Sequence, residues 1–337
     1  MARLEVAIGP ITARNPIFSA SGTYGHGLEM TGFTPIERLG GWVSKTVTLH
    51  PRHGNPAPRL CETEAGLINS IGLENKGIDH YVEHVLPTLV GIDSIVVTNI
   101  GGERDEELVE LAARLDGQAE VDVLELNLSC PNVQDGKLPL ATDPARSEAV
   151  VRRVREATTK PIWVKLTPNV TRIGDMAVAA EAGGADGITA VNTLLGLSVD
   201  WRSGRPGVAT VQGGYSGPGI KPVALRSAWE CAKRVSIPVV GVGGITSADD
   251  VLQFLAVGCA AVQVGTSAFS DPSRPGRLAE EVGALLDAAG IGDVRDVIGT
   301  IRDGRQHTPG AAGSPSGAAG DGAGRERDRG QPCASKT

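Results

Sequence analysis

The sequence predicts an α/β fold, a (β/α)₈ TIM barrel of parallel strands, on the basis of three observations. Short runs rich in β-branched residues alternate with amphipathic stretches almost throughout the chain. The connections between them are mostly short, which is typical of a parallel sheet. Eight such strand–helix units fit within about 290 residues, which favours a closed barrel over an open doubly wound sheet.

The eight expected strands are short apolar runs bounded by polar or glycine-containing turns. In chain order they are residues 17–20, 42–45, 94–98, 121–126, 162–165, 187–191, 239–242 and 261–264. Apolar residues at helical spacing predict helices between them, including residues 106–115, 145–157, 175–182 and 249–256.

Two segments lie outside the minimal barrel. Residues 4–12 are expected to form a small N-terminal hairpin, which would plug the bottom of the barrel before the first strand. Residues 46–75 are polar, contain Pro51, Pro56 and Pro58, and are too long for a simple strand–helix turn. We expect them to form an extended loop over the C-terminal mouth, where barrel enzymes keep their sites.

The end of the chain changes character at about Gly304. Glycine, alanine, serine, proline and arginine dominate there, without the apolar periodicity that a core would use. Such a segment buries too little apolar surface to offset the conformational entropy lost on folding. We therefore expect one barrel domain over residues 1–303 and a disordered, low-complexity tail over residues 304–337.

Composition excludes several classes of partner. The 337 residues carry a formal charge of −7 and only 3% aromatic residues, which argues against a binding surface for nucleic acid. The first residues contain no long apolar stretch, so neither a signal peptide nor a membrane anchor is expected. With 41% hydrophobic residues, the chain can still form a substantial core.

Cysteine and histidine give no metal pattern. The five cysteines form no Cys-x-x-Cys pair and are Cys61, Cys130, Cys231, Cys259 and Cys333. This spacing does not support structural zinc or an iron–sulfur cluster ligated within the chain, and it fits a reducing cytoplasmic location. The pair His80/His84 is interpreted as part of a solvated helix face.

The predicted strand ends are unusually polar, although the carboxyl ends of barrel strands converge on one site. The residues at or just after these ends include Ser21, Lys45, Thr46, Asn99, Asn127, Lys165, Asn192 and Thr193. Any one of them has an ordinary explanation as the first residue of a loop. Three asparagines and two lysines at successive strand ends are not explained by barrel packing, so they indicate a candidate site.

The last two strands end in Gly243-Gly244 and Gly265-Thr266. Glycines followed by helix starts let backbone N–H groups approach a phosphate without obstruction by side chains. Ser247 and Asp250 have the spacing of a capping box for the helix after the seventh strand. These features predict a site for a phosphorylated ligand, without saying which one.

Lys165 has three possible roles at a strand end. It is a Schiff-base nucleophile, an ion-pair partner, or a positive charge beside a cofactor. Glu125 has the same inward parity as Asn127, so an ion pair between Lys165 and Glu125 is one expectation. The residues alone leave these three interpretations open.

Cys130 lies in the segment Asn-Leu-Ser-Cys-Pro-Asn at residues 127–132, after the fourth strand. A thiol there is able to act as a general base if its thiolate is accessible, and Pro131 fixes where the sulfur points. The alternative is a buried small hydrophobe, which we favour for Cys231 and Cys259. For Cys130 the strand-end position and neighbouring amides favour catalysis.

Eight ordered motifs between residues 4 and 301 give the chain a specific resemblance to a known family. They are Ser44-Lys45-Thr46, Gly54-Asn55-Pro56-Ala57-Pro58-Arg59, Asn69-Ser70-Ile71-Gly72-Leu73-Glu74-Asn75, Asn127-Leu128-Ser129-Cys130-Pro131-Asn132, Lys165-Leu166-Thr167-Pro168, Asn192-Thr193, Tyr215-Ser216-Gly217-Pro218 and Gly243-Gly244-Ile245. The chain resembles dihydroorotate dehydrogenase, most closely the catalytic subunit of the NAD-linked class (class 1B).

The resemblance implies a cofactor, a substrate and their contacts. FMN would contact Ser21, Lys45, Thr46, Asn99, Asn127, Lys165, Val191, Gly217, Gly243, Gly244, Gly265 and Thr266. Dihydroorotate or orotate would be held by Lys45, Asn69, Ser70, Ile71, Gly72, Leu73, Asn127, Asn192 and Thr193. Cys130 would remove the C5 proton of dihydroorotate as the C6 hydride moves to FMN. Because a free thiol is only a few per cent ionised near neutral pH, activity should rise on the alkaline side.

The class implies a partner and a pathway. The NAD-linked class works in pyrimidine (UMP) biosynthesis with a second subunit that carries FAD and a [2Fe–2S] cluster, as a homodimer within a heterotetramer. The membrane-linked class has an N-terminal helical extension and a serine base, neither of which this sequence shows. The segment Glu62-Thr63-Glu64-Ala65-Gly66 is more similar to the NAD-linked class than to the fumarate-using one. The tail after Ile301 departs from the family pattern.

Three alternatives to this interpretation are weighed. The first is a fumarate-dependent (class 1A) homodimer, which also has a cysteine base. The second is a lysine-dependent aldolase-type barrel that binds a sugar phosphate. The third is a non-catalytic flavoprotein or binding scaffold.

Overall fold

Eight parallel strands close into a barrel in the computed structural model, which describes residues 1–128 and 142–302. They are β3 (Ile17–Ser19), β4 (Gly41–Val43), β7 (Ile95–Ile100), β8 (Val123–Asn127), β9 (Ile162–Leu166), β10 (Gly187–Ala190), β15 (Val239–Val242) and β16 (Ala261–Val264). Pairing of Val262 with Ile17 closes the ring between β16 and β3. The predicted barrel is confirmed, with every strand boundary within two residues of the expectation.

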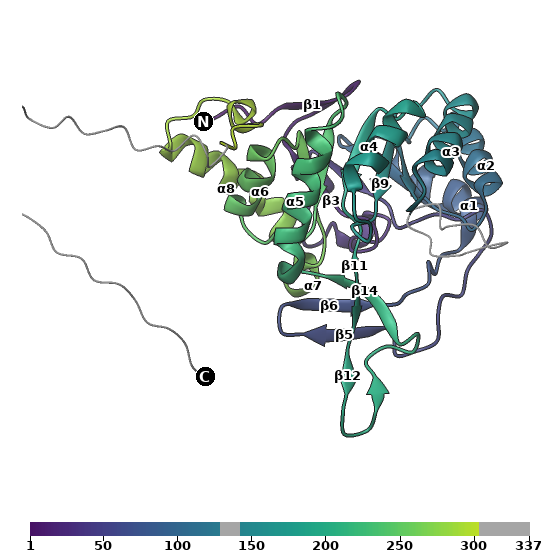
Figure 1. Cartoon of the computed structure of the whole chain (residues 1–337). Helices are drawn as coiled ribbons and strands as arrows, with labels where there is room; N and C mark the ends of the chain where they lie inside the picture. Colours follow the sequence, from purple (N-terminus) through teal and green to yellow (C-terminus); the bar gives the residue numbers. More distant parts are fainter. Residues whose placement is uncertain (129–141, 303–337) are drawn as a thin grey trace, which may run out of the picture. The chain divides into compact units, whose positions relative to one another are not determined.

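Helices follow the barrel strands and lie outside them (Figure 1). The longer ones are α2 (Asp105–Asp116), α3 (Pro144–Ala157), α4 (Ile173–Ala182), α5 (Lys221–Ala232), α6 (Ala248–Ala256) and α8 (Arg274–Ala288). Shorter ones are α1 (Gly77–His80), α7 (Ser267–Ser270), a π-helix at Tyr81–Val85, and 3₁₀ turns at Leu28–Met30, Ile36–Arg38, Leu86–Leu89, Pro218–Ile220 and Val294–Val297. In α2 the buried residues Leu108, Leu111 and Leu115 recur at the spacing that places one apolar face against the sheet.

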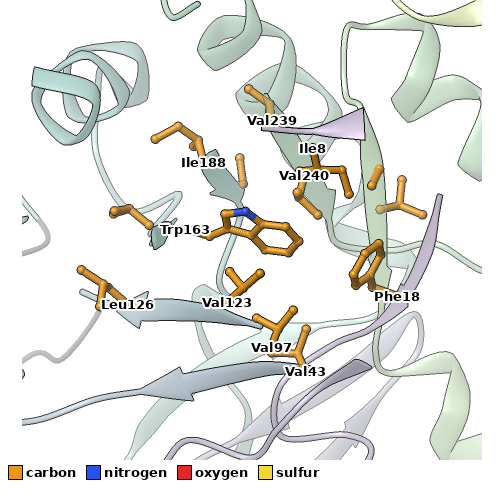
Figure 2. Close-up of a cluster of buried hydrophobic side chains, with 14 of the residues drawn as sticks. Ile8, Phe18, Val43, Val97, Val123, Leu126, Trp163, Ile188, Val239 and Val240 are labelled. Carbon is orange, nitrogen blue, oxygen red and sulfur yellow. The ribbon is translucent and has the colours of Figure 1, made fainter. Parts of the chain in front are cut away.

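The lower half of the barrel interior is apolar. Phe18 and Trp163 meet edge to face, with ring centroids 5.6 Å apart, and valines of β4, β7 and β8 surround them (Figure 2). Ile8 belongs to the hairpin of β1 (Val6–Ile8) and β2 (Ile11–Ala13), and it is fully buried in the same cluster. The neighbouring Gly9 packs against the backbone just before β10. The hairpin therefore covers the bottom of the barrel, as predicted.

Two insertions combine into a second, antiparallel sheet. It has the order β11-β14-β6-β5 and contains β5 (Leu60–Thr63), β6 (Gly66–Asn69), β11 (Leu194–Leu197) and β14 (Gln212–Ser216). A further hairpin, β12 (Val199–Asp200) and β13 (Arg205–Pro206), extends from it (Figure 1).

A loop was expected at residues 46–75, but the strands within it and the whole insertion after β10 were not predicted. These strands are short, rich in glycine and half-exposed, so they lack the apolar runs that marked the barrel strands.

Residues Met1–Ile301 form one compact unit. Residues 129–141 and 303–337 lie outside the described part of the chain, so the expectation of a disordered tail from residue 304 stays a prediction. In the described residues, no helix is both long and apolar enough to cross a membrane.

Candidate active site

The ends of β3, β4, β7 and β8 bring several predicted site residues together. Ser21 Oγ and Thr46 Oγ1 are 3.5 Å apart. A Cβ added at Gly101 would lie 2.8 Å from Thr46 Cγ2 and 3.8 Å from side-chain carbons of both Asn127 and Leu73. Residues from four separate segments of the sequence therefore surround one position at the mouth.

Lys45 lies beside this position, directly after β4. Its side chain is half-buried, and no carboxylate of the described residues lies within 4.0 Å of its ammonium group. A cation without a carboxylate partner inside a protein favours an anionic ligand. Lys45 is therefore the described residue best suited to pair with a negatively charged group at the mouth.

Asn127 and Asn192 meet across the mouth. Asn192 Nδ2 donates to Asn127 Oδ1 at 3.1 Å, and the backbone N–H of Thr193 donates to Asn192 Oδ1 at 2.8 Å. Both amides are therefore held in fixed orientations. Two amides fixed in this way are suited to a planar polar ligand with both donors and acceptors.

The loop at residues 69–73 follows β6 in the second sheet. Asn69 Nδ2 donates to the carbonyl of Gly214, and the backbone of Gly214 in turn packs against the Thr193 side chain. Ser70 Oγ lies 2.5 Å from Thr210 Oγ1, which fixes the loop against the end of β14. The second sheet thus brings the 69–73 loop close to Thr193, while the substrate contacts of these residues stay a prediction.

Leu73 is conformationally unusual. Its φ angle is 56°, a region that bulky residues rarely adopt, and Gly72 before it has a φ of 75°. A non-glycine residue in this region costs free energy and is found most often where a site needs it. Ile71 is anchored through its carbonyl, which accepts from the Asn55 N–H at 3.0 Å.

Below the mouth lies an interior cluster of five polar side chains from five strands: Asn99, Glu125, Lys165, Thr189 and Gln263. All are at most 5% exposed. Lys165 Nζ lies 3.6 Å from Glu125 Oε1 and donates to Gln263 Oε1 at 3.3 Å. The expected ion pair between Lys165 and Glu125 is confirmed.

The Glu125 carboxylate accepts three further hydrogen bonds. Asn99 Nδ2 donates to Oε1 at 2.7 Å, while Thr189 Oγ1 and Gln263 Nε2 donate to Oε2 at 2.8 and 2.6 Å. The sequence analysis named neither Thr189 nor Gln263 as a site residue. The available signal was a glutamine in the middle of an apolar strand, at an inward position.

Asn99 has one buried atom without a partner. Its Nδ2 donates to Glu125, but its Oδ1 is buried and accepts no hydrogen bond from residues 1–128 or 142–302. An unsatisfied buried acceptor is costly, and native structures contain few of them. The atom is therefore suited to accept a hydrogen bond from a ligand donor.

The turns that are predicted to bind a phosphate also lie close to other predicted site residues. Thr266 Oγ1 donates to Ser216 Oγ at 2.9 Å, which places the end of β16 beside Gly217. Gly243 and Gly244 have φ angles of 129° and 76°. A Cβ at Gly244 would lie 2.6 Å from the Lys221 side chain, so the fold itself requires glycine there.

The capping box that begins α6 is confirmed. Ser247 Oγ accepts from the Asp250 N–H, and Asp250 Oδ2 accepts from the N–H groups of Thr246 and Ser247. Burial opposes ionisation of Asp250, but hydrogen bonds from Lys221, Thr246 and Ser247 outweigh it and hold its pKa at about 2. The turn before α6 is therefore rigidly organised.

Val191 links two strand ends. It is buried, and its N–H donates to the Val242 carbonyl at 3.0 Å, which ties the end of β10 to the end of β15 just before Gly243. The predicted cofactor residue therefore contributes backbone at the mouth.

Cys130 lies outside the described residues, so its predicted role stays a prediction. Cys231 and Cys259 are fully buried, and burial raises the pKa of Cys231 to about 12 and that of Cys259 further. Both are packing residues, as expected. Cys61 is free and partly exposed.

A cavity of about 740 Å³ opens beside Lys45 and is lined in part by His26, His80 and His84. The His80 and His84 rings meet edge to face at 4.6 Å, and His80 Nδ1 is buried. His84 is exposed, in keeping with the expected solvated face, whereas His80 is partly buried at the end of α1. Across residues 1–128 and 142–302, no group of three or more His, Cys, Asp or Glu residues is arranged to hold a metal ion.

Comparisons with known proteins agree with this geometry. A family model described as dihydroorotate dehydrogenase matches residues 3–286. A protein of Trichlorobacter lovleyi is 45% identical over 298 residues, covering 88% of this chain and 98% of that protein. A protein of Geobacter sulfurreducens is 47% identical over the same shares. Both are named dihydroorotate dehydrogenase B (NAD(+)), catalytic subunit.

A solved structure has the same fold. The crystal structure of a dihydroorotate dehydrogenase of Eimeria tenella, in complex with ferulenol, superposes with a TM-score of 0.73. The two sequences are 23% identical, and the match covers 88% of each chain. At this identity the structural likeness supports the fold, while the family model and the relatives establish the family. The chain belongs to the dihydroorotate dehydrogenase family of oxidoreductases.

Proposed function

We propose that this chain oxidises (S)-dihydroorotate to orotate in pyrimidine biosynthesis and passes the electrons towards NAD⁺ through a partner subunit. The relatives support the NAD⁺ linkage, because they are named as catalytic subunits of an NAD(+)-linked enzyme. The observation that carries the proposal is the convergence of Lys45, the Asn127–Asn192 pair and the 69–73 loop on one mouth.

FMN fits the residues at this mouth. Asn99 Oδ1 is a buried acceptor that no described residue satisfies, which suits a ring N–H of a flavin. Lys165 places a cation in the barrel interior, and the turns at Gly217, Gly243 and Thr266 offer backbone N–H groups to a phosphate. We propose the twelve cofactor contacts named above on this basis. When bound, FMN supplies the acceptor for the hydride that leaves C6 of the substrate.

The chain's own residues would bind and orient the substrate. Lys45 pairs with the substrate carboxylate, because it is a cation without a carboxylate partner among the described residues. The Asn127 and Asn192 amides offer hydrogen bonds to the ring carbonyls and N–H groups. The 69–73 loop closes the outer side, held by Asn69 and Ser70.

Cys130 is proposed as the general base. It would take the C5 proton while the C6 hydrogen leaves as hydride, so that the ring gains its C5=C6 double bond with balanced electrons. Support for this role comes from the sequence, in which Cys130 follows the buried residue Leu128 by two positions, just after β8.

The proposed assembly contains a second copy of the chain and an electron-transfer subunit with FAD and a [2Fe–2S] cluster. The exposed hairpin of β12 and β13, with the neighbouring strand β11, carries Leu195, Leu197, Val199 and Trp201, each more than half exposed. Apolar side chains gathered on one projecting element favour burial in an interface, and the same surface on two copies forms a two-fold contact. The free thiols of the described residues fit a cytoplasmic location.

An anaerobic titration tests the function. Purified protein is expected to show flavin absorption that dihydroorotate bleaches stoichiometrically. Addition of the partner subunit and NAD⁺ should restore the absorption much faster than fumarate does. Rapid reoxidation by fumarate with this chain alone would favour the fumarate-dependent class instead.

The same preparation tests the aldolase alternative. Lys165 is only 5% exposed and already engaged by Glu125 and Gln263, which disfavours a Schiff-base nucleophile. Protein that lacks a flavin band and is labelled at Lys165 by borohydride in the presence of a sugar phosphate would reverse the proposal.

A further inference from the structure

The interior cluster holds a second ionisable residue, Glu125, to which the proposed reaction gives no direct role. Glu125 is fully buried and lies on β8, two residues before Asn127. Side chains two apart on a strand point to the same face, so Glu125 stands one layer below the mouth. It is thus placed to act on the cofactor site through its neighbours.

Its hydrogen bonds fix the orientation of those neighbours. A carboxylate has acceptors only, so the Asn99 and Gln263 amides must both turn their NH₂ groups towards it. The Gln263 carbonyl is then left to accept from Lys165, and the Asn99 carbonyl is left without a partner in the part of the chain that the structure describes. Glu125 therefore determines which atoms of Asn99 and Lys165 remain for a ligand.

Its charge also balances that of Lys165. The two groups are 3.6 Å apart, and both side chains are at most 6% exposed. At this distance and burial their interaction is weakly screened, so a third group nearby experiences them largely as a neutral pair. A lysine alone at this position would present a full positive charge instead.

We propose that Glu125 is a positioning residue that acts through Lys165, and that the neutrality of this pair sets the reduction equilibrium of the bound flavin. This inference rests on the proposed function, because it requires FMN at the mouth. It differs from a role for the Lys165 charge alone, since removing both charges together should have little effect.

The test measures the two-electron midpoint potential of bound FMN in four proteins. Glu125→Gln leaves the Lys165 charge without a counter-charge. Reduction of FMN should therefore become about tenfold more favourable, a rise of about 30 mV in the midpoint potential. Lys165→Met leaves the Glu125 carboxylate without a counter-charge and should make reduction of FMN about tenfold less favourable. The double variant restores a neutral pair and should lie within about threefold of wild type.

Two controls separate charge from packing. Thr189→Val removes one hydrogen bond to Glu125 but keeps the charge of Glu125. The reduction equilibrium of the flavin should therefore change by less than about twofold. Asp186→Asn removes an equal charge just before β10, at the end of the strand opposite the mouth, where Asp186 pairs with Arg155. This substitution should also leave the midpoint potential unchanged. Circular dichroism and the FMN dissociation constant of each variant confirm that it is folded and loaded.

The outcomes are distinct. If Glu125→Gln leaves the potential unchanged, or if Thr189→Val shifts it equally, Glu125 does not act through charge balance. If Glu125→Gln does not fold, the comparison of Lys165→Met with the double variant decides: a double variant as displaced as Lys165→Met overturns the proposal. Wild-type protein that binds no flavin overturns the proposed function as well, whereas loaded wild type with a silent Glu125→Gln overturns only this inference.

Discussion

The two lysines of the candidate site differ in what surrounds their charges. Lys165 is buried beside Glu125, while Lys45 is half-buried with no carboxylate of the described residues within 4.0 Å. The first charge is therefore largely internal to the barrel, and the second is available to a ligand. Sequence placed both at strand ends but did not distinguish them, because the distinction depends on which strands are neighbours in space.

Replacement of Cys130 tests whether its thiol is the base that takes the substrate proton. Cys130→Ser replaces a thiol by a hydroxyl that is far harder to ionise, so flavin bleaching by dihydroorotate at pH 7 should slow by about 10²- to 10⁴-fold. The wild-type rate should rise as pH increases towards the thiol's ionisation. Anaerobic stopped-flow traces between pH 6 and 10 measure both effects.

Cys61→Ser is the matched control, since Cys61 is partly exposed on β5 and outside the assigned site. Its bleaching rate should equal that of the wild type. A Cys130→Ser variant with the wild-type rate and pH profile would show that another group takes the proton.

Single residues also show which contacts of the candidate site could be predicted from the sequence. The Lys165–Glu125 pair was predictable because strand parity fixes which side chains point inwards. Thr189 and Gln263 were not recognised, since threonine is an ordinary strand residue and an isolated glutamine does not reveal its partner. The sequence could not reveal that no described residue satisfies Asn99 Oδ1, because this depends on how the Asn99 amide turns towards Glu125 on the neighbouring strand.

Among the elements, α6 depends on one carboxylate. Asp250 has a pKa of about 2 in the folded protein, below the value of about 3.9 expected when it is unfolded. Because the folded pKa is the lower one, the stabilisation is present above about pH 4 and is lost as pH falls towards 2. The capping box therefore contributes to acid stability.

Asp250→Asn should lower the free energy of unfolding at pH 7 by about 1–2 kcal/mol, and the difference from wild type should shrink by pH 3. Urea unfolding of the flavin-loaded protein at several pH values measures this. Asp249→Asn is the control, because Asp249 is the exposed neighbouring residue and accepts only from Gln253. A difference that is the same at both pH values would contradict the assignment.

The barrel elements were predictable and the second sheet was not. The barrel strands consist mostly of apolar residues that are buried on both faces, which leaves a clear local signal. Strands such as β14 contain two adjacent glycines and pair with residues about 145 positions away, as Gly214 does with Asn69. Their structure comes from that distant pairing and has little local signal.

At the scale of the whole molecule, the projecting hairpin predicts self-association. Trp201 is 76% exposed at its tip, with the Arg202 guanidinium over its ring. Trp201→Glu places a charge in the proposed two-fold contact and should raise the dimer dissociation constant at least tenfold, with little effect on the Tm of the monomeric unit. Sedimentation equilibrium measures the constant.

Trp229→Glu is the matched control. Trp229 is a partly exposed tryptophan on α5 that also stacks on a cation, Lys233. It should leave self-association unchanged. Equal weakening by both substitutions, or a wild-type protein that is monomeric at micromolar concentration, would exclude the hairpin as the contact.

The apolar floor of the barrel has a consequence for proton exchange. Phe18, Trp163 and Ile8 are fully buried and fill the lower end of the barrel with side chains that offer water few hydrogen bonds. A ligand seated at the mouth would cover Glu125 and Lys165 from above, so proton exchange between these side chains and solvent should slow when the site is occupied. Whether a ligand occupies the mouth would then influence how readily Glu125 and Lys165 exchange protons with solvent during a turnover.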